Sequence, residues 1–114
     1  MSVHKRKQGS TELETVTIKE QGVPLDLTNV TTVTWWQREV GASSNKVSNG
    51  TMVITDAVNG ICTFDPEGAG SSGTDAFDTA VDYEVYTRLV WSDGDITRHP
   101  DEGYEIFSIE PFFE

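Results

Sequence analysis

Residues 82–91 read Asp-Tyr-Glu-Val-Tyr-Thr-Arg-Leu-Val-Trp, and their apolar and polar side chains alternate along the run. Alternation of this kind predicts a β-strand, because successive side chains of a strand point to opposite faces of the sheet. One face of the predicted strand carries Tyr83, Val85, Thr87, Leu89 and Trp91. The opposite face carries Glu84, Tyr86, Arg88 and Val90.

Similar short runs, separated by turn residues, recur along the rest of the chain. We predict further strands over residues 12–20, 30–39, 52–55, 61–64, 96–99 and 104–109. Asn59-Gly60 is the strongest hairpin signal, segment 41–50 is predicted to be a loop, and segment 75–80 can form one helical turn. About seven short strands without a helical period predict an all-β fold, with an antiparallel β-sandwich as the leading architecture.

The chain length allows one domain with a single small core, since it has 114 residues. We expect a basic N-terminal arm over residues 1–9 and a sandwich domain over residues 10–114, ending in a short C-terminal tail. Lys5, Arg6 and Lys7 make the arm basic. The arm is expected either to fray or to lie on an acidic neighbour, such as a second copy of the chain.

The net charge of −11 belongs to one half of the sequence. Residues 1–64 hold six acidic and six basic side chains, whereas residues 65–114 hold 13 acidic side chains with only Arg88 and Arg98 as bases. This balance argues against nucleic acid as a partner, because phosphate binding draws on a basic face. An acidic, lysine-poor surface suits a protein that works in concentrated salt, although ordinary acidic proteins share it.

The sequence contains few features that indicate the cellular compartment of the protein. No apolar run approaches the length of a membrane span, and segment 1–9 has no apolar region of a secretory signal, so we expect a soluble, uncleaved chain. The single cysteine, Cys62, excludes an intrachain disulfide and is expected to be a buried apolar residue.

Catalytic and metal-binding signals are weak. The two histidines, His4 and His99, are not placed by spacing next to a nucleophile, so we expect no enzyme activity and no cofactor. Asp93 and Asp95, which flank Gly94, are weak candidates for a Ca²⁺ site, but they do not match the calcium-loop spacing, and turn formation explains them equally well.

Some aromatic residues are not expected to fit in the core, and large aromatic side chains outside a core indicate contact surfaces. Trp35 and Trp36 are adjacent on a strand, so at most one of them lies in the main core and the other faces outward. We assign the outward position to Trp36, where it can meet a partner protein or stack on a sugar. Phe112 and Phe113 follow the last predicted strand and either dock on another subunit or fold back on the sandwich.

Ordered sequence pieces resemble a known viral domain. They are the strand 14–20 leading into Gly22-Val23-Pro24-Leu25-Asp26-Leu27-Thr28, then Val33-Thr34-Trp35, the stretch 54–64, the run from Asp82 to Gly94, and His99-Pro100-Asp101-Glu102-Gly103-Tyr104 before the closing strand. In this order they resemble the small immunoglobulin-like domain at the N-terminus of the phage baseplate upper protein, and they cover nearly all of the chain from about residue 10.

The resemblance implies an immunoglobulin-like β-sandwich and a non-enzymatic structural protein of the virion. Its partners would be copies of itself and other virion proteins in the tail, baseplate or adsorption apparatus. A head-surface component, such as a capsid decoration or turret, and a module that binds a host surface glycan are the alternatives. The chain stops at Glu114, where the larger baseplate proteins continue, so the role of carrying a fibre does not transfer. The acidity would suit a tailed virus of a salt-loving, archaeal host.

Overall fold

The fold is all-β over residues 3–100 and 104–111, which are the residues that the computed structural model describes. The chain forms β1 (Val3–Lys7), β2 (Glu14–Thr17), β3 (Lys19–Glu20), β4 (Val23–Pro24), β5 (Val30–Glu39), β6 (Val47–Asp56), β7 (Ile61–Phe64), a short 3₁₀ turn η1 (Ser71–Gly73), β8 (Asp82–Trp91), β9 (Ile96–His99) and β10 (Glu105–Glu110).

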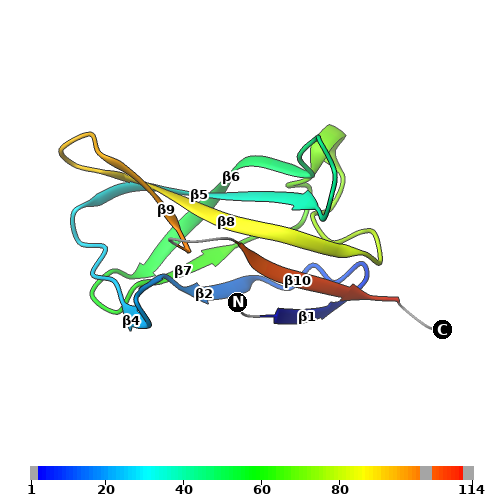
Figure 1. The fold of residues 1–114 in the computed structure, drawn as a ribbon, viewed down its shortest axis with the longest axis horizontal. Helices are drawn as coiled ribbons and strands as arrows, with labels where there is room; N and C mark the ends of the chain where they lie inside the picture. The colour runs from blue at the N-terminus through cyan, green and yellow to red at the C-terminus, as the bar shows by residue number, and fades with distance from the viewer. Residues whose placement is uncertain (1–2, 101–103, 112–114) are drawn as a thin grey trace.

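One curled sheet of eight strands dominates the structure (Figure 1). The strands follow the order β1-β10-β8-β5-β6-β7-β2, and β3 and β4 form a separate two-stranded ribbon. The remaining strand, β9, pairs with the second half of β8, whereas β10 pairs with its first half. The pairs between neighbouring strands of the large sheet are antiparallel, except that β1 runs parallel to β10. Because the sheet curls, its first and last strands, β1 and β2, come to the same side of the molecule (Figure 1).

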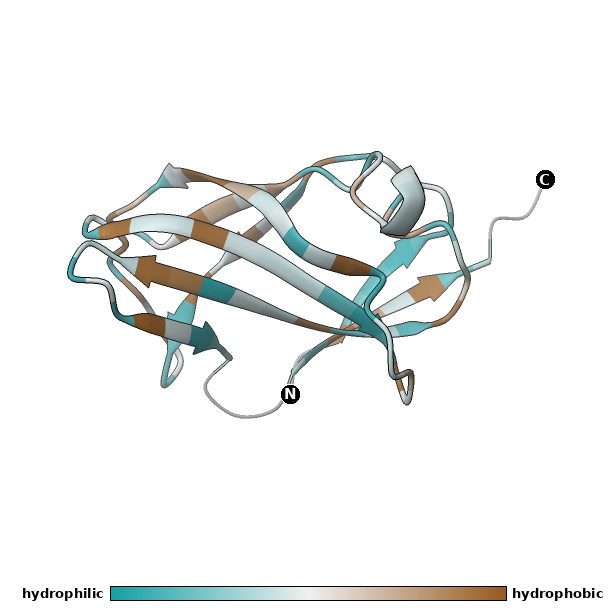
Figure 2. Cartoon of the chain, turned by 90° about the horizontal axis from the view of Figure 1, so that it is seen from above, coloured by the Kyte–Doolittle hydropathy of each residue, from teal (hydrophilic) through white to brown (hydrophobic). Residues whose placement is uncertain are grey.

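The core lies inside this curl, where side chains of opposite walls meet. Trp35 of β5 is fully buried and stacks on Phe64 of β7, with ring centroids 4.3 Å apart and an angle of 1° between the planes. Phe107 of β10 and Phe77 of the loop before β8 meet the indole edge-on. Hydrophobic positions therefore alternate with hydrophilic ones along the long strands, as Figure 2 shows.

A buried polar contact fixes the centre of this core. Gln37 is only 1% exposed, and its Oε1 accepts a hydrogen bond of 2.9 Å from Nε1 of Trp35. Its Nε2 donates to the carbonyl of Ala76 at 2.7 Å. One amide thus satisfies the indole N–H and ties the loop before β8 to the middle of the sheet.

Four predicted strands have the bounds that we expected, namely 30–39, 61–64, 82–91 and 96–99. Three other expectations were wrong. The predicted loop 41–50 contains the first residues of β6, segment 75–80 forms no helical turn, and the single strand over 12–20 divides into β2 and β3.

The described residues form ten strands, whereas we expected about seven. Eight of the ten belong to one curled sheet, and the expected seven-strand sandwich is not observed as such. The additional strands are β1, β4 and the second piece of the divided strand. β1 falls in the segment that we expected to be an arm, and its backbone is instead paired with β10 from Val3 to Lys7.

Candidate functional site

Three aromatic side chains gather on the outer face of the sheet. Trp36 of β5 and Tyr86 of β8 are cross-strand partners, and their rings are parallel within 3° with centroids 5.8 Å apart. Tyr104, just before β10, follows at 6.4 Å from Tyr86. The indole Nε1 of Trp36 donates to Oγ1 of Thr34 at 3.0 Å, which holds the ring on the sheet. We call these three rings the outer aromatic cluster.

An ion pair borders the outer aromatic cluster. Nε of Arg38 donates to a carboxylate oxygen of Glu84 at 2.8 Å, and the hydrogen bond and the negative charge of that carboxylate raise the pKa of Arg38. The guanidinium also lies 5.4 Å from the ring of Tyr104 and 3.3 Å from its hydroxyl. The charged pair thereby fixes one end of the aromatic surface.

A shallow hollow of about 220 Å³ lies between the cluster and the ion pair. Its described lining consists of Trp36, Gln37, Arg38, Asn45, Glu84, Tyr86 and Tyr104. Flat rings beside amide, guanidinium and carboxylate groups suit the side chain of a partner protein or one sugar ring.

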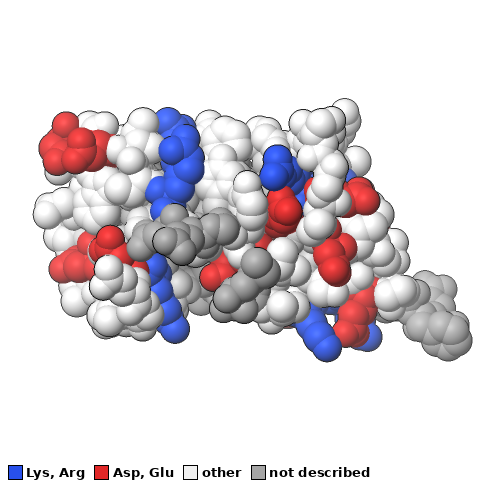
Figure 3. Space-filling model, in the orientation of Figure 1, with Lys and Arg blue, Asp and Glu red and all other residues white. Residues whose placement is uncertain are grey.

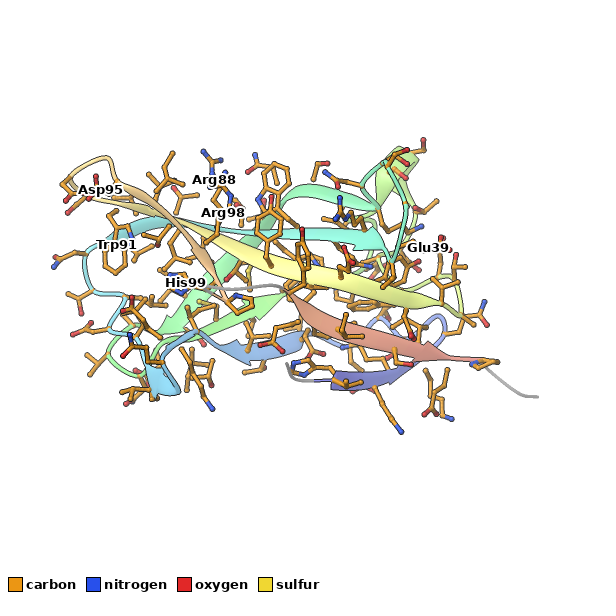
Figure 4. The ribbon with its side chains drawn as sticks, viewed as in Figure 1. Glu39, Arg88, Trp91, Asp95, Arg98 and His99 are labelled. Carbon is orange, nitrogen blue, oxygen red and sulfur yellow. The ribbon has the colours of Figure 1, made fainter. Side chains whose placement is uncertain are left out.

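Two arginines continue the same outer face away from the hollow. Arg88 of β8 is the cross-strand partner of Arg98 of β9, and Figure 4 labels them next to each other. In the same orientation, a blue band crosses the upper left of the space-filling view at this place (Figure 3). We call Arg88 and Arg98 the arginine pair.

A larger hollow of about 860 Å³ opens between β2 and the inner side of β8, β9 and β10. It contains both histidines, and each has a partner. Nε2 of His4 lies 3.3 Å from Oε2 of Glu105, and its ring stacks on Phe107 at 4.5 Å. Nε2 of His99 lies 3.1 Å from Oγ1 of Thr97. The described lining includes one carboxylate, that of Glu105, and no cysteine.

The Asp93 and Asp95 side chains belong to a tight hairpin turn. A carboxylate oxygen of Asp93 accepts a hydrogen bond of 3.0 Å from the backbone N–H of Asp95, and Gly94 has a φ of +93°. This is the geometry of a turn that closes β8 and β9. Within residues 3–100 and 104–111, no three His, Cys, Asp or Glu residues form a group that could hold a metal ion.

Cys62 faces the core of the curl and is fully buried. Burial raises the pKa of its thiol to about 11. Since the thiolate is the reactive form, this cysteine is poorly suited to act as a nucleophile at neutral pH.

The basic N-terminal residues mostly bind carboxylates of their own chain. Arg6 points into the curl, where it pairs with Glu14, and its guanidinium lies 4.7 Å from the ring of Phe77. Nζ of Lys7 lies 2.8 Å from Oε2 of Glu110. Lys5 alone of the three has an exposed side chain with no ion pair to a described residue.

The structure therefore does not bring the predicted interface residues of the N-terminal segment together with Trp36 in one site. Trp36 faces outward, as we expected. Arg6 and Lys7 instead form ion pairs with Glu14 and Glu110, which attach β1 to β2 and β10 of the same sheet. Phe112 and Phe113 lie outside the described residues. The alternation of 82–91 had placed Tyr86 and Arg88 on the same face of the strand, but only the structure shows that this face is the outer one and that the two residues adjoin Trp36 and Arg98.

Comparison with protein-family models, with curated proteins and with solved structures found no match to this chain. Within the described part of the chain, no helix is long and apolar enough to cross a membrane.

Proposed function

We propose that this chain is a non-enzymatic structural protein of a tailed virus, and that it joins virion proteins through the outer aromatic cluster. The proposal places it in the tail, baseplate or adsorption apparatus, in symmetric copies, on the strength of the sequence resemblance. The observation that supports a binding role is the gathering of Trp36, Tyr86 and Tyr104 on the outer face of the sheet, while other aromatic rings form the core inside the curl. Tryptophan and tyrosine are enriched where proteins meet.

The fold proposal is that the curled sheet is a variant of the immunoglobulin-like sandwich. Two walls of the curl face each other across stacked rings, since Trp35 of β5 packs on Phe64 of β7. The parallel pairing of the first strand with the last, β1 with β10, supports the same assignment.

A binding role is favoured over catalysis by the chemistry of the reactive side chains. The thiol of Cys62 is buried, and the described lining of the large hollow pairs His4 with a carboxylate and holds His99 beside a threonine. Neither arrangement presents an activated nucleophile to a bound substrate.

The first test is assembly of the full chain with the other virion proteins. We expect the double substitution Trp36→Ser and Tyr86→Ser to reduce binding at least 10-fold, because it removes two stacked rings from the contact. Light scattering of the chain, alone and with each candidate neighbour, measures the effect, and circular dichroism verifies that the variant is folded.

The matched control removes apolar surface elsewhere. Val53 and Val58 are 59% and 67% exposed and lie outside the cluster, so Val53→Ser with Val58→Ser should leave assembly within about twofold of the wild type. A wild-type chain that stays monomeric with every neighbour and is absent from purified particles would disprove the proposed function.

A glycan-binding role is the second candidate, and the hollow beside Trp36 favours it. Parallel aromatic rings next to the polar groups of Arg38, Asn45 and Glu84 resemble the way in which proteins hold a sugar ring. Binding of the chain to a glycan array, lost on Trp36→Ser, would support this candidate over a protein contact.

A further inference from the structure

The charge of the arginine pair is unusual in two respects, because the pair lies in the acidic half of the sequence and sets two like charges opposite each other. Arg88 and Arg98 are the only bases among residues 65–114, which hold 13 acidic side chains, yet they stand directly opposite each other on β8 and β9. Like charges opposite each other on a sheet destabilise it. Neither arginine has an ion pair with a residue in the described ranges.

The register places the two arginine side chains next to each other. The N–H of Trp91 donates to the carbonyl of Asp95 at 2.8 Å, where the hairpin begins. Because hydrogen-bonded and non-hydrogen-bonded pairs alternate along an antiparallel ladder, Arg88 and Arg98 form a non-hydrogen-bonded pair, in which the side chains approach most closely. Both side chains point to the outer face.

One N–H group of the arginine pair is buried and has no hydrogen-bond partner among the described residues. Nε of Arg88 is buried without a hydrogen-bond acceptor among the described residues, while the Arg98 side chain is exposed beside it. Two adjacent guanidinium groups present a row of N–H donors that matches carboxylate oxygens in paired hydrogen bonds. The chemistry of this place therefore calls for an anionic partner.

The backbone beside the arginine pair indicates what kind of anion fits. Among the described strands, β9 pairs only with β8, so no described strand occupies its other edge, which we call the open edge of β9. The same alternation turns the N–H and C=O groups of Ile96 and Arg98 toward that open edge. An extended polypeptide can hydrogen-bond to such an edge as an added strand, whereas a polysaccharide cannot continue the ladder.

We propose that the open edge of β9 receives an extended acidic segment of another protein, whose carboxylates bind the arginine pair. Charge also disfavours a symmetric pairing of two copies through this edge, because it would bring the arginine pairs of the two copies close to each other. The inference rests on the proposed function, since it names the partner chemistry for one part of the same outer face.

The probe is an eight-residue synthetic peptide in which glutamate alternates with threonine, so that the carboxylates share one face of the added strand. We expect it to shift the backbone amide resonances of Ile96 and Arg98 in the full chain and to bind more weakly as salt rises. The double substitution Arg88→Gln and Arg98→Gln should weaken binding at least 10-fold.

Two controls accompany the probe. A peptide with glutamine in place of glutamate should bind at least 10-fold more weakly. The double substitution Lys5→Gln and Lys19→Gln removes the same charge from exposed positions outside the site, so it should change binding less than twofold.

Three outcomes would overturn the inference. The first is absence of peptide binding, or equal binding to the arginine double variant. The second is binding of an oligogalacturonate to the arginine pair without shifts of the β9 amides and without peptide binding, which would indicate an acidic polysaccharide. The third is concentration-dependent shifts of the β9 edge in the chain alone, which would indicate a second copy. Assembly that still depends on Trp36 and Tyr86 would leave the proposed function standing in each case.

Discussion

Gly60→Ala is expected to lower the free energy of unfolding by more than about 2 kcal/mol. Gly60 has a φ of +71° in the turn between β6 and β7. A Cβ atom there would stand 2.7 Å from the carbonyl oxygen of Leu25 and 2.8 Å from that of Ile18. Both are backbone atoms, and the two residues are joined by a hydrogen bond that the N–H of Leu25 donates to the carbonyl oxygen of Ile18. The methyl group would therefore push against the residues on both sides of the β3–β4 ribbon, where it joins the large sheet.

Gly94→Ala is the matched control for this prediction. Gly94 also has a positive φ, +93°, but no atom lies within 4 Å of the position that its Cβ would take. The backbone conformation alone then costs about 1 kcal/mol. Urea unfolding of both variants measures the difference, and equal losses of stability would contradict the packing described for Gly60.

Gln37→Leu is expected to destabilise the chain by about 3 kcal/mol, although leucine is apolar and similar in size. The substitution leaves the indole N–H of Trp35 and the carbonyl of Ala76 without the hydrogen bonds that Gln37 gives them. Both groups are in the core, where an unsatisfied donor or acceptor has no access to water. The loss is measured by thermal or urea unfolding.

Gln8→Leu is the control for Gln37→Leu. Nε2 of Gln8 also donates to one backbone carbonyl, that of Asp78 at 2.9 Å, but the side chain is only partly buried. Water can replace the lost donor, so we expect a loss below about 1 kcal/mol. A Gln37→Leu variant as stable as Gln8→Leu would show that the amide of Gln37 does not hold the core.

The long strands could be predicted from sequence because local pattern and tertiary pairing agree in them. Residues 30–39 and 82–91 are both rich in β-branched and aromatic side chains, and the second run also alternates; they form the adjacent strands β5 and β8. Asn59-Gly60 likewise marks the turn that leads into β7. In these segments each local preference supports the observed structure.

Two strands could not be predicted because their pairing overrides local composition. β1 is almost entirely basic, and Arg6 is partly buried there because its guanidinium pairs with Glu14 and lies over the ring of Phe77. The start of β6 is rich in Ser, Asn and Gly, yet it pairs with β5. Gly50 is required there, since a Cβ would come within 2.8 Å of Val47 and 3.1 Å of Phe64.

The candidate site was only partly visible in the sequence. Alternation predicts which side chains of one strand share a face, so it separates Trp36 from Trp35 and Tyr86 from Val85. The register between two strands, however, is a property of the tertiary structure. It places Trp36 opposite Tyr86, Arg38 opposite Glu84 and Arg88 opposite Arg98. Similarly, the basic cluster near the N-terminus was expected either to fray or to lie on an acidic neighbour, whereas Arg6 and Lys7 bind Glu14 and Glu110 of the same chain.

The most direct test of the central claim, that the outer aromatic cluster is the contact surface in the virion, is site-specific photo-crosslinking in assembled particles. A benzophenone amino acid is placed at Trp36 in one variant and at Val53, an exposed position outside the cluster, in another. We expect the probe at position 36 to crosslink to a neighbouring virion protein or a second copy, and the probe at position 53 to give no crosslink. Crosslinks from position 53 but none from position 36 would contradict the claim.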